Sequence, residues 1–243
     1  MMNQWDSKLL FDRQANNQAA ARFYNAGVPA TRRTLTLLDR DHPLRANAEA
    51  FIQRIFFSSY QARISHFYPQ LLCITENVRG GDDDFTAVAG VRCAASGPLF
   101  SEYYLHDPIE SVLAVPRRQI VEIGNLSPAS MGQARWLIAT LNAFMAAAGF
   151  THVVFTAVPK LRNAFNRMGL PLQYLAEADA ERLPEGMSHD WGNYYAARPA
   201  VFSGDILLGE TFLRPRSKPD HRLMGLRQHA AELGRQFTCE LPD

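Results

Sequence analysis

The spacing of hydrophobic positions changes along the chain between a period of two residues and one of three to four. Alternation or a short apolar run predicts strands at residues 31–39, 71–78, 85–95, 117–127, 151–158, 172–178 and 191–206. Apolar positions three or four residues apart predict helices between Pro43 and Tyr68 and over residues 107–115, 130–149, 159–169 and 220–237. Elements in this order build a mixed β-sheet with helices on its faces, so the pattern predicts an α/β fold.

Composition divides the chain into three parts. Residues 1–30 are polar and rich in Asn, Gln and Ala, which predicts an N-terminal arm. Residues 31–206 carry the alternating elements and form one predicted domain, and residues 207–243 are a C-terminal extension with an amphipathic helix. The chain has 243 residues, of which 47% are hydrophobic, so it can bury a core without metal ions or disulfide bonds.

Charge and hydropathy exclude two classes of partner. The chain has 25 basic and 24 acidic residues, so we expect no nucleic-acid binding. Its longest apolar stretch, residues 136–150, contains Thr140 and Asn142 and is shorter than the roughly 20 residues that span a bilayer. The sequence does not begin with a basic-then-apolar signal region. We therefore expect a cytoplasmic protein without stable membrane insertion.

The cysteines and histidines give no sign of a metal site. Cys73, Cys93 and Cys239 cannot all pair and form no Cys-x-x-Cys motif, so we expect reduced thiols, with Cys73 and Cys93 buried in a hairpin. The seven histidines have no metal-ligand spacing, and no Gly-x-Ser-x-Gly, phosphate-loop or His-Glu-x-x-His motif occurs. The aspartates at 82–84 fit a solvated hairpin tip better than an ion cage. No metal is predicted.

The strand at 117–127 carries an unusual carboxylate. Glu122 follows Ile120 and Val121 in a strand expected to be central, where an unpaired charge is costly. Alternation places Glu122 and Gly124 on one face, and Val121, Ile123 and Asn125 on the other. Glu122 is therefore either a structural ion pair, for example with Arg92, or a base or amine-binding group in a cleft. Asn125 is a candidate for positioning a substrate carbonyl or amine.

Two further places suggest ligand binding. Gly132 and Ala134 open a helix directly after this strand, and such a helix start binds a phosphate or serves close packing. Glu102 stands beside Tyr103 and Tyr104, a pattern that lines a pocket for a cationic amine or simply buries two tyrosines. Trp191 allows the same two interpretations.

Several segments together resemble one bacterial family. They are FYPQLL, AVAGVRCA, LFSEYYLHDPIE, IVEIGNLS, VFTAVPKLRNAFNRMGL and DWGNYYAARPAVFSGDI. Between residues 51 and 206 their combination resembles the thermostable hemolysins, which are similar to the GNAT acyltransferase fold and, more closely, to acyl-homoserine-lactone synthases. The resemblance implies a GNAT-like fold, an amine acceptor and an acyl thioester donor. The donor, acyl-CoA or the acyl-phosphopantetheine of acyl carrier protein, would lie along strand 117–127 where strand 151–158 splays from it.

The chain departs from these relatives at three positions. Acyl-homoserine-lactone synthases read Glu-x-Ser-Arg where this chain has Glu122-Ile123-Gly124-Asn125, and the missing arginine disfavours S-adenosylmethionine as the acceptor. The GNAT pyrophosphate loop matches only at Gly132 and Ala134, because Ala129 replaces its first side chain. The tyrosine that GNAT enzymes often use as general acid falls at Phe165.

The resulting prediction is an N-acyltransferase that moves a fatty acyl group from a carrier thioester to a small amine or amino acid. The alternatives are a non-catalytic module that binds an acyl carrier or lipid, and a directly membrane-lytic protein. The candidate catalytic residues are Glu122, Asn125 and Glu102. The candidate donor-binding residues are Leu126, Ser127, Ser130, Gly132, Gln133, Ala134, Arg135 and Asn163, and the acceptor pocket is assigned to Tyr103, Tyr104, Arg92 and Trp191. Candidates for a surface that binds acidic acyl carrier protein are Arg117, Arg118, Arg135, Lys160 and Arg162.

Overall fold

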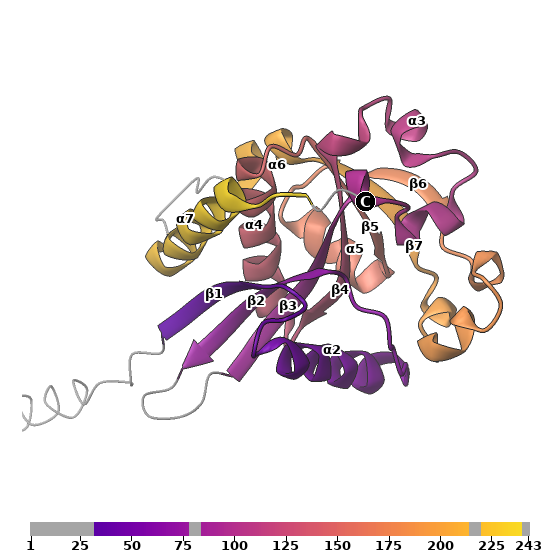
Figure 1. The fold of residues 1–243 in the computed structure, drawn as a ribbon, viewed down its shortest axis with the longest axis horizontal. Helices are drawn as coiled ribbons and strands as arrows, with labels where there is room; N and C mark the ends of the chain where they lie inside the picture. The colour runs from indigo at the N-terminus through magenta and orange to yellow at the C-terminus, as the bar shows by residue number, and fades with distance from the viewer. Residues whose placement is uncertain (1–31, 78–83, 214–219, 240–243) are drawn as a thin grey trace, which may run out of the picture.

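The computed structural model describes residues 32–77, 84–213 and 220–239. A seven-stranded sheet has the order β1-β2-β3-β4-β5-β7-β6, in which β4 and β5 are parallel and every other neighbouring pair is antiparallel. The strands are β1 (Arg32–Leu38), β2 (Gln70–Asn77), β3 (Asp84–Cys93), β4 (Ile120–Pro128), β5 (His152–Ala157), β6 (Gln173–Glu177) and β7 (Ala200–Asp205). The mixed sheet with flanking helices (Figure 1) confirms the predicted α/β fold.

Helices cover both faces of the sheet. They are α2 (Arg45–Tyr60), α3 (Ile109–Leu113), α4 (Met131–Ala147), α5 (Pro159–Arg167), α6 (Ile206–Leu213) and α7 (His221–Gln236). Neighbouring side chains of β2 show the two faces: Leu72 shares a core with residues of α4, α5 and α7, whereas Leu71 packs with α2. Figure 1 shows α2 below the sheet and α4 above it.

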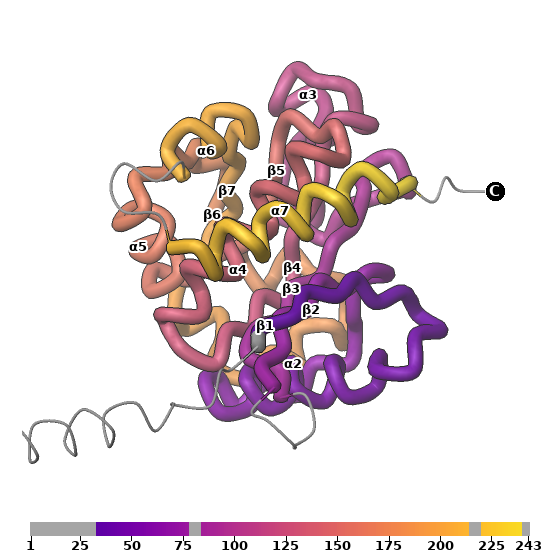
Figure 2. Tube along the Cα trace, turned by 90° about the vertical axis from the view of Figure 1, so that its left-hand side faces the viewer, coloured from indigo at the N-terminus to yellow at the C-terminus, as the bar shows by residue number. Residues whose placement is uncertain are grey.

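Helix α4 is the central helix of its layer. Its N-cap is Ser130, whose Oγ accepts a hydrogen bond from the Gln133 backbone N–H at 3.4 Å, and Gly149 with φ +85° follows its end. Helix α7 crosses α4 (Figure 2), and Gly234 is needed there, since a Cβ at this position would collide with the backbone carbonyl oxygen of Phe144 and lie 3.1 Å from the Ala147 Cβ. The described part of the C-terminal extension therefore packs against the sheet layer.

Strands β4 and β5 separate at their carboxyl ends. Their parallel register ends at the Ile123–Phe155 pair, although β4 continues to Pro128 and β5 to Ala157. A bulge in β4 shifts the β3–β4 register: Val88 and Gly90 pair with Ser127 and Gly124, so Asn125 and Leu126 of β4 face the single residue Ala89 of β3. Because bulges bend strands, the second half of β4 follows β3 and leaves β5. Helices α4 and α5 both begin at this separation.

Two predicted elements are shorter than the sequence pattern indicated. The helix expected to reach Tyr68 ends at Tyr60, because Gln61 takes the left-handed conformation with φ +55° and a loop begins there. The strand predicted over 191–206 is β7 alone, since 3-10 turns occupy the residues before Pro199 and Gly192 takes φ +49°. The predicted arm at 1–30 and most of the predicted hairpin tip lie outside the described residues.

A disulfide joins Cys93 to Cys239, whose Cα atoms are 5.8 Å apart. The prediction of reduced thiols is therefore wrong for this pair. The two residues are 146 positions apart in sequence, and only the packing of α7 on α4 and β1 brings them together. Cys73 is a free buried thiol, as predicted, and burial raises its pKa to about 12. The cytoplasmic localisation, which went with reduced thiols, stays a prediction.

In the described ranges, none of the helices has the length and apolar character that crossing a bilayer requires. Within the same ranges, no three His, Cys, Asp or Glu side chains are grouped as metal ligands would be.

Candidate active site

A cavity of about 270 Å³ opens where β4 and β5 separate. Its walls are the second half of β4 with the start of α4, the end of β5 with the start of α5, the end of α2 with the loop after it, and two aromatic segments. The structure brings five of the predicted site residues to this cavity, namely Tyr104, Asn125, Leu126, Ser130 and Trp191.

Glu122 lies behind the wall of this cavity. It is 1% exposed, and its two carboxylate oxygens accept hydrogen bonds from the backbone N–H groups of Phe100 at 2.9 Å and Ser101 at 2.6 Å. Burial raises the pKa of Glu122, and interactions with Ser101, Tyr68 and Phe100 oppose that shift. Arg92 is opposite Glu122 in the β3–β4 register, but no ion pair joins them in the described residues. Backbone donors, not the suggested arginine, hold this carboxylate.

Tyr68 connects Glu122 to the cavity. Its ring lies against the backbone of two facing glycines: a Cβ on Gly124 would be 2.7 Å from the Tyr68 Oη, and a Cβ on Gly90 would be 2.7 Å from the Tyr68 Cβ. No side chain fits at either position without moving the ring. Burial raises the pKa of Tyr68, as do the negative charge of Glu122 and hydrogen bonding to it. The hydroxyl therefore stays protonated beside the carboxylate.

Asn125 fixes the loop that carries Tyr68. It takes the left-handed conformation with φ +49°, and its Oδ1 accepts the Tyr68 backbone N–H at 3.1 Å while its Nδ2 donates to the His66 carbonyl at 3.3 Å. Its Oδ1 lies 2.9 Å from where a Gly90 Cβ would be, on the same face as Tyr68. Strict alternation predicted the opposite face. The prediction is wrong because the β3–β4 bulge interrupts the alternation.

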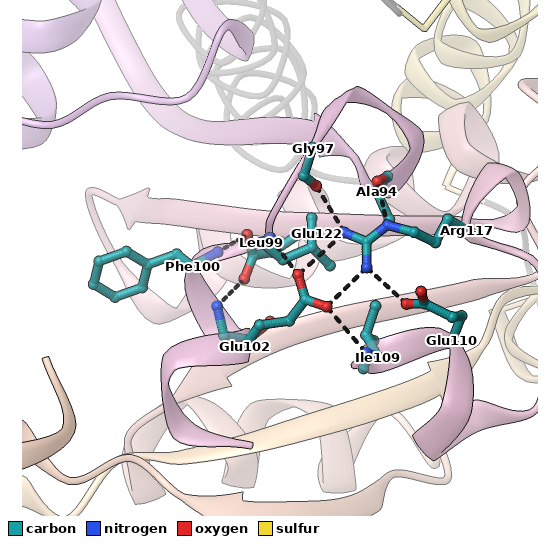
Figure 3. Close-up of polar contacts among 10 residues, drawn as sticks. Ala94, Gly97, Leu99, Phe100, Glu102, Ile109, Glu110, Arg117 and Glu122 are labelled. Carbon is teal, nitrogen blue, oxygen red and sulfur yellow. Dashed lines mark hydrogen bonds and ion pairs between the residues drawn. The ribbon is translucent and has the colours of Figure 1, made fainter. Parts of the chain in front are cut away.

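Glu102 lies outside the cavity wall, in a polar cluster shown in Figure 3. Its carboxylate accepts the backbone N–H groups of Leu99 at 2.6 Å and Ile109 at 3.0 Å, and it forms an ion pair with Arg117 at 2.8 Å. Burial raises the pKa of Glu102, but these hydrogen bonds outweigh it, so the pKa lies below its ordinary value. Arg117 also forms an ion pair with Glu110 at 2.7 Å, so both ion-pair partners of its guanidinium are carboxylates of this chain.

The cluster around Glu102 has a structural consequence for Glu122. Glu102 closes the turn over residues 100–104, and the backbone of that turn supplies the two N–H groups that bind Glu122. Glu102 therefore supports this turn and lies outside the cavity, and its predicted catalytic role stays a prediction.

Aromatic rings form one wall of the cavity. They belong to Phe56, Tyr60, Tyr68, Phe100, Tyr104, Trp191 and Tyr194. The ring centroids of Trp191 and Tyr194 are 5.1 Å apart, and those of Phe100 and Trp191 are 5.6 Å apart. Of the predicted acceptor residues, Tyr104 and Trp191 lie in this wall. Tyr103 is 42% exposed and, like Arg92, lies outside it.

The starts of two helices form the opposite wall. Ser130 and Met131 of α4 and Lys160 of α5 line the cavity, so free backbone N–H groups, two helix-dipole ends and an ammonium group meet there. The other predicted donor-binding residues are placed differently: Ser127 and Ala134 are buried, Gly132, Gln133 and Arg135 belong to the first turns of α4, and Asn163 is exposed on α5.

A second, apolar cavity of about 40 Å³ lies on the α4 side of the sheet. It shares Ile123 and Leu126 of β4 with the first cavity. Phe165 lines it and stacks on Phe155 with the ring centroids 4.7 Å apart. Phe165, the position to which the resemblance assigned a general-acid tyrosine, is thus part of a buried apolar wall.

A family model described as thermostable hemolysin matches residues 38–210. The chain belongs to the thermostable hemolysin family. No curated protein matches it in sequence. Among solved structures, TofI in an apo form is similar with a TM-score of 0.52 at 12% identity, over 74% of this chain and 95% of that one. FeeM, an N-acyl amino acid synthase from uncultured soil microbes, has a TM-score of 0.51 at 12% identity, over 75% and 95% of the two chains.

A third similar structure is BjaI, a CoA-dependent acyl-homoserine lactone synthase with SAM and isopentyl-CoA. Its TM-score is 0.51 at 13% identity, over 82% of the thermostable hemolysin-family chain and 90% of BjaI. These likenesses confirm the predicted GNAT-like fold.

The residues of this thermostable hemolysin-family chain that line the cavity but were missed by sequence reasoning include Tyr60, His66 and Tyr68. A signal for Tyr68 was present in the strands. Gly90 and Gly124 interrupt runs of β-forming residues, and a glycine inside a strand indicates the close approach of a bulky group.

Proposed function

We propose that this protein is an N-acyltransferase that moves a fatty acyl group from an acyl thioester to a small amine or amino acid. One observation carries the proposal: a single cavity at the separation of β4 and β5 joins two helix starts to an aromatic wall backed by a buried carboxylate. FeeM and BjaI, which have the same fold, are named for acyl-amine products and, for BjaI, a CoA donor.

The donor, acyl-CoA or acyl carrier protein, would bind at the helix starts. Its phosphate fits the N-terminus of α4 at Ser130 and the ammonium of Lys160. The pantetheine arm would run along β4 where β5 has left it, and a β4 backbone N–H would polarise the thioester carbonyl. The acyl chain would enter the second, apolar cavity between Ile123 and Leu126, where the two cavities adjoin.

The acceptor would bind against the aromatic wall. An ammonium group is attracted by ring faces, and the Tyr68 hydroxyl, coupled to Glu122, offers it an oxygen lone pair. Glu122 then acts through Tyr68, since its own oxygens accept backbone N–H groups and it does not line the cavity. Asn125 acts as a positioning residue for Tyr68, because both ends of its amide are hydrogen-bonded to the loop.

The test is a thiol-release assay with mass spectrometry. Coenzyme A and acyl-carrier-protein donors of several chain lengths are mixed with a pool of amino acids and polyamines. We expect one new acyl-amide mass that needs both the protein and one donor class. A Tyr68→Phe variant that folds normally should turn over at least ~10-fold more slowly, since it loses one hydrogen bond to the reacting amine.

Two outcomes would contradict the transferase. A folded protein that is silent across the pool would instead support a non-catalytic binding module, which the replacements at Ala129 and Phe165 favour. Leakage of liposomes caused by the protein without any acyl donor would support a directly lytic protein.

A further inference from the structure

His66 lies in the cavity wall, on the loop between α2 and β2. Its backbone carbonyl accepts a hydrogen bond from the Asn125 side chain of β4 at 3.3 Å. Asn125 is just beyond Ile123, the last residue of β4 paired with β5. The loop is therefore pinned at the point where the strands separate, which is where the proposed thioester would lie.

A chain of hydrogen bonds orients the His66 ring. The Ser65 Oγ donates to the Asp190 Oδ2 at 2.7 Å, and it lies 3.2 Å from the His66 Nδ1. A serine hydroxyl has one proton and an ionised carboxylate has none to give, so the Ser65 proton is committed to Asp190. The Ser65 oxygen can then only accept from Nδ1–H. This fixes the neutral tautomer in which Nε2 of His66 carries the free lone pair.

Asp190 is itself held in place. Its backbone carbonyl accepts the Arg63 N–H at 2.7 Å, and the neighbouring Asn193 N–H donates to the Tyr60 carbonyl at 2.7 Å. The turn that carries Asp190 thus stays docked on the end of α2 and the loop after it. Nucleophile activation by an oriented base uses the same arrangement, in which a third group fixes the ring of the base.

We propose that His66 is the general base of the acyl transfer, with Ser65 and Asp190 as positioning residues; this inference rests on the proposed function. The acceptor ammonium gives one proton to Nε2 of His66, and the neutral amine attacks the thioester carbon. Collapse of the tetrahedral intermediate keeps the new C–N bond and breaks the C–S bond. The departing sulfur takes a second proton from the nitrogen and leaves as a thiol, and the imidazolium returns its proton to water.

Exposure distinguishes His66 from Glu122 as a base. Glu122 is 1% exposed and each of its oxygens accepts a backbone N–H, so it has no path for releasing a proton to water at every turnover. The His66 side chain is exposed. It can exchange its proton with solvent, and His66 is one of the residues that line the cavity.

The titratable and charged groups around His66 come from several elements. Asp190 reaches it through Ser65, and Arg63 precedes it with the guanidinium over the Phe57 ring. The groups that share its cavity are Tyr60, Tyr68, Tyr104, Lys160 and Tyr194, with Glu122 behind Tyr68. Histidines ordinarily change charge between about pH 5 and 8, where tyrosine and lysine side chains are normally protonated.

The experiment measures kcat and KM against pH for the full chain and for His66→Gln, with the donor and acceptor found by the assay above. We expect kcat for His66→Gln to fall about 100-fold or more with the KM for the donor unchanged, and the limb between about pH 5 and 8 to disappear. His229→Gln, which removes an exposed histidine of α7, is the matched control and should keep the wild-type rate and profile.

A second readout needs no turnover. The ¹⁵N NMR spectrum of the imidazole should show His66 with its proton on Nδ1, and Ser65→Ala should release that preference. If His66→Gln keeps the rate and pH profile of an active wild type, His66 is not the general base, and the transferase proposal stands. A proton found on Nε2 of His66 would have the same meaning. A folded wild type without turnover overturns the transferase and the base together, whatever the tautomer.

Discussion

The contact between the Tyr68 ring and the backbone of Gly124 predicts that Gly124→Ala destabilises the protein. The new Cβ would lie 2.7 Å from both the Cε1 and the Oη of Tyr68, well inside ordinary contact. The ring cannot move away without weakening other contacts of Tyr68. The Tyr68 backbone N–H donates to Asn125, and its hydroxyl interacts with Glu122. Gly124 has an ordinary φ, so alanine causes no backbone strain there. The whole effect should come from the clash.

Overpacking of this kind typically costs about 1–3 kcal/mol of unfolding free energy. In a chain of this size that corresponds to a Tm lower by roughly 2–12 °C. Because Tyr68 lies between the cavity and Glu122, displacement of its ring should also lower the turnover of the proposed reaction.

Thermal unfolding of four proteins tests the reasoning: wild type, Gly124→Ala, Tyr68→Ala and the double variant. If the clash is with the ring, Gly124→Ala should cost almost nothing in the Tyr68→Ala background. Gly225→Ala is the control, since a Cβ on this exposed helical glycine meets nothing within 4 Å and should stabilise α7 by up to about 1 kcal/mol. A Gly124→Ala protein with the wild-type Tm, or an equal loss of stability in both backgrounds, would refute the predicted clash with the Tyr68 ring.

The remaining predictions concern the buried carboxylates and the disulfide. Glu122→Gln must turn an NH₂ group toward the N–H of Phe100 or Ser101, so urea unfolding should show a loss of about 1–3 kcal/mol, and an unchanged stability would contradict the hydrogen bonds described. The pKa of Glu102 is lowered in the folded protein, so its contribution to stability is present above the ordinary glutamate pKa of about 4.3 and is lost as the pH falls through the folded value. The Tm difference between wild type and Glu102→Gln should therefore shrink on acidification, and a difference that stays constant would argue against the lowered pKa. Cys239→Ser should lower the unfolding free energy by about 2–5 kcal/mol, and reducing agent should lower the Tm of the wild type but not of the variant; a wild type insensitive to reduction would contradict the disulfide.

The local pattern of the sequence determined most of the elements and the sheet class. The strand at Ile120–Pro128, the helix capped by Ser130 and the buried position of Glu122 follow from apolar periodicity and capping preferences, which act over a few residues. The resemblance of several short segments was enough to indicate the family and the GNAT-like fold. The residue pattern and the resemblance together indicated Tyr104, Leu126, Ser130 and Trp191, which line the cavity.

Only the tertiary structure decided which groups meet. The disulfide between Cys93 and Cys239 spans 146 positions, and the contacts of Asn125 with His66 and Tyr68 depend on a bulge that reversed the expected face. The hydroxyl of Ser65, which contacts the His66 ring, is hydrogen-bonded to Asp190, more than a hundred residues away. Local periodicity carries no information about such distant pairs, because their contacts come from the packing of whole elements. The sequence therefore indicated several segments around the cavity, and the packing determined which of their side chains meet there.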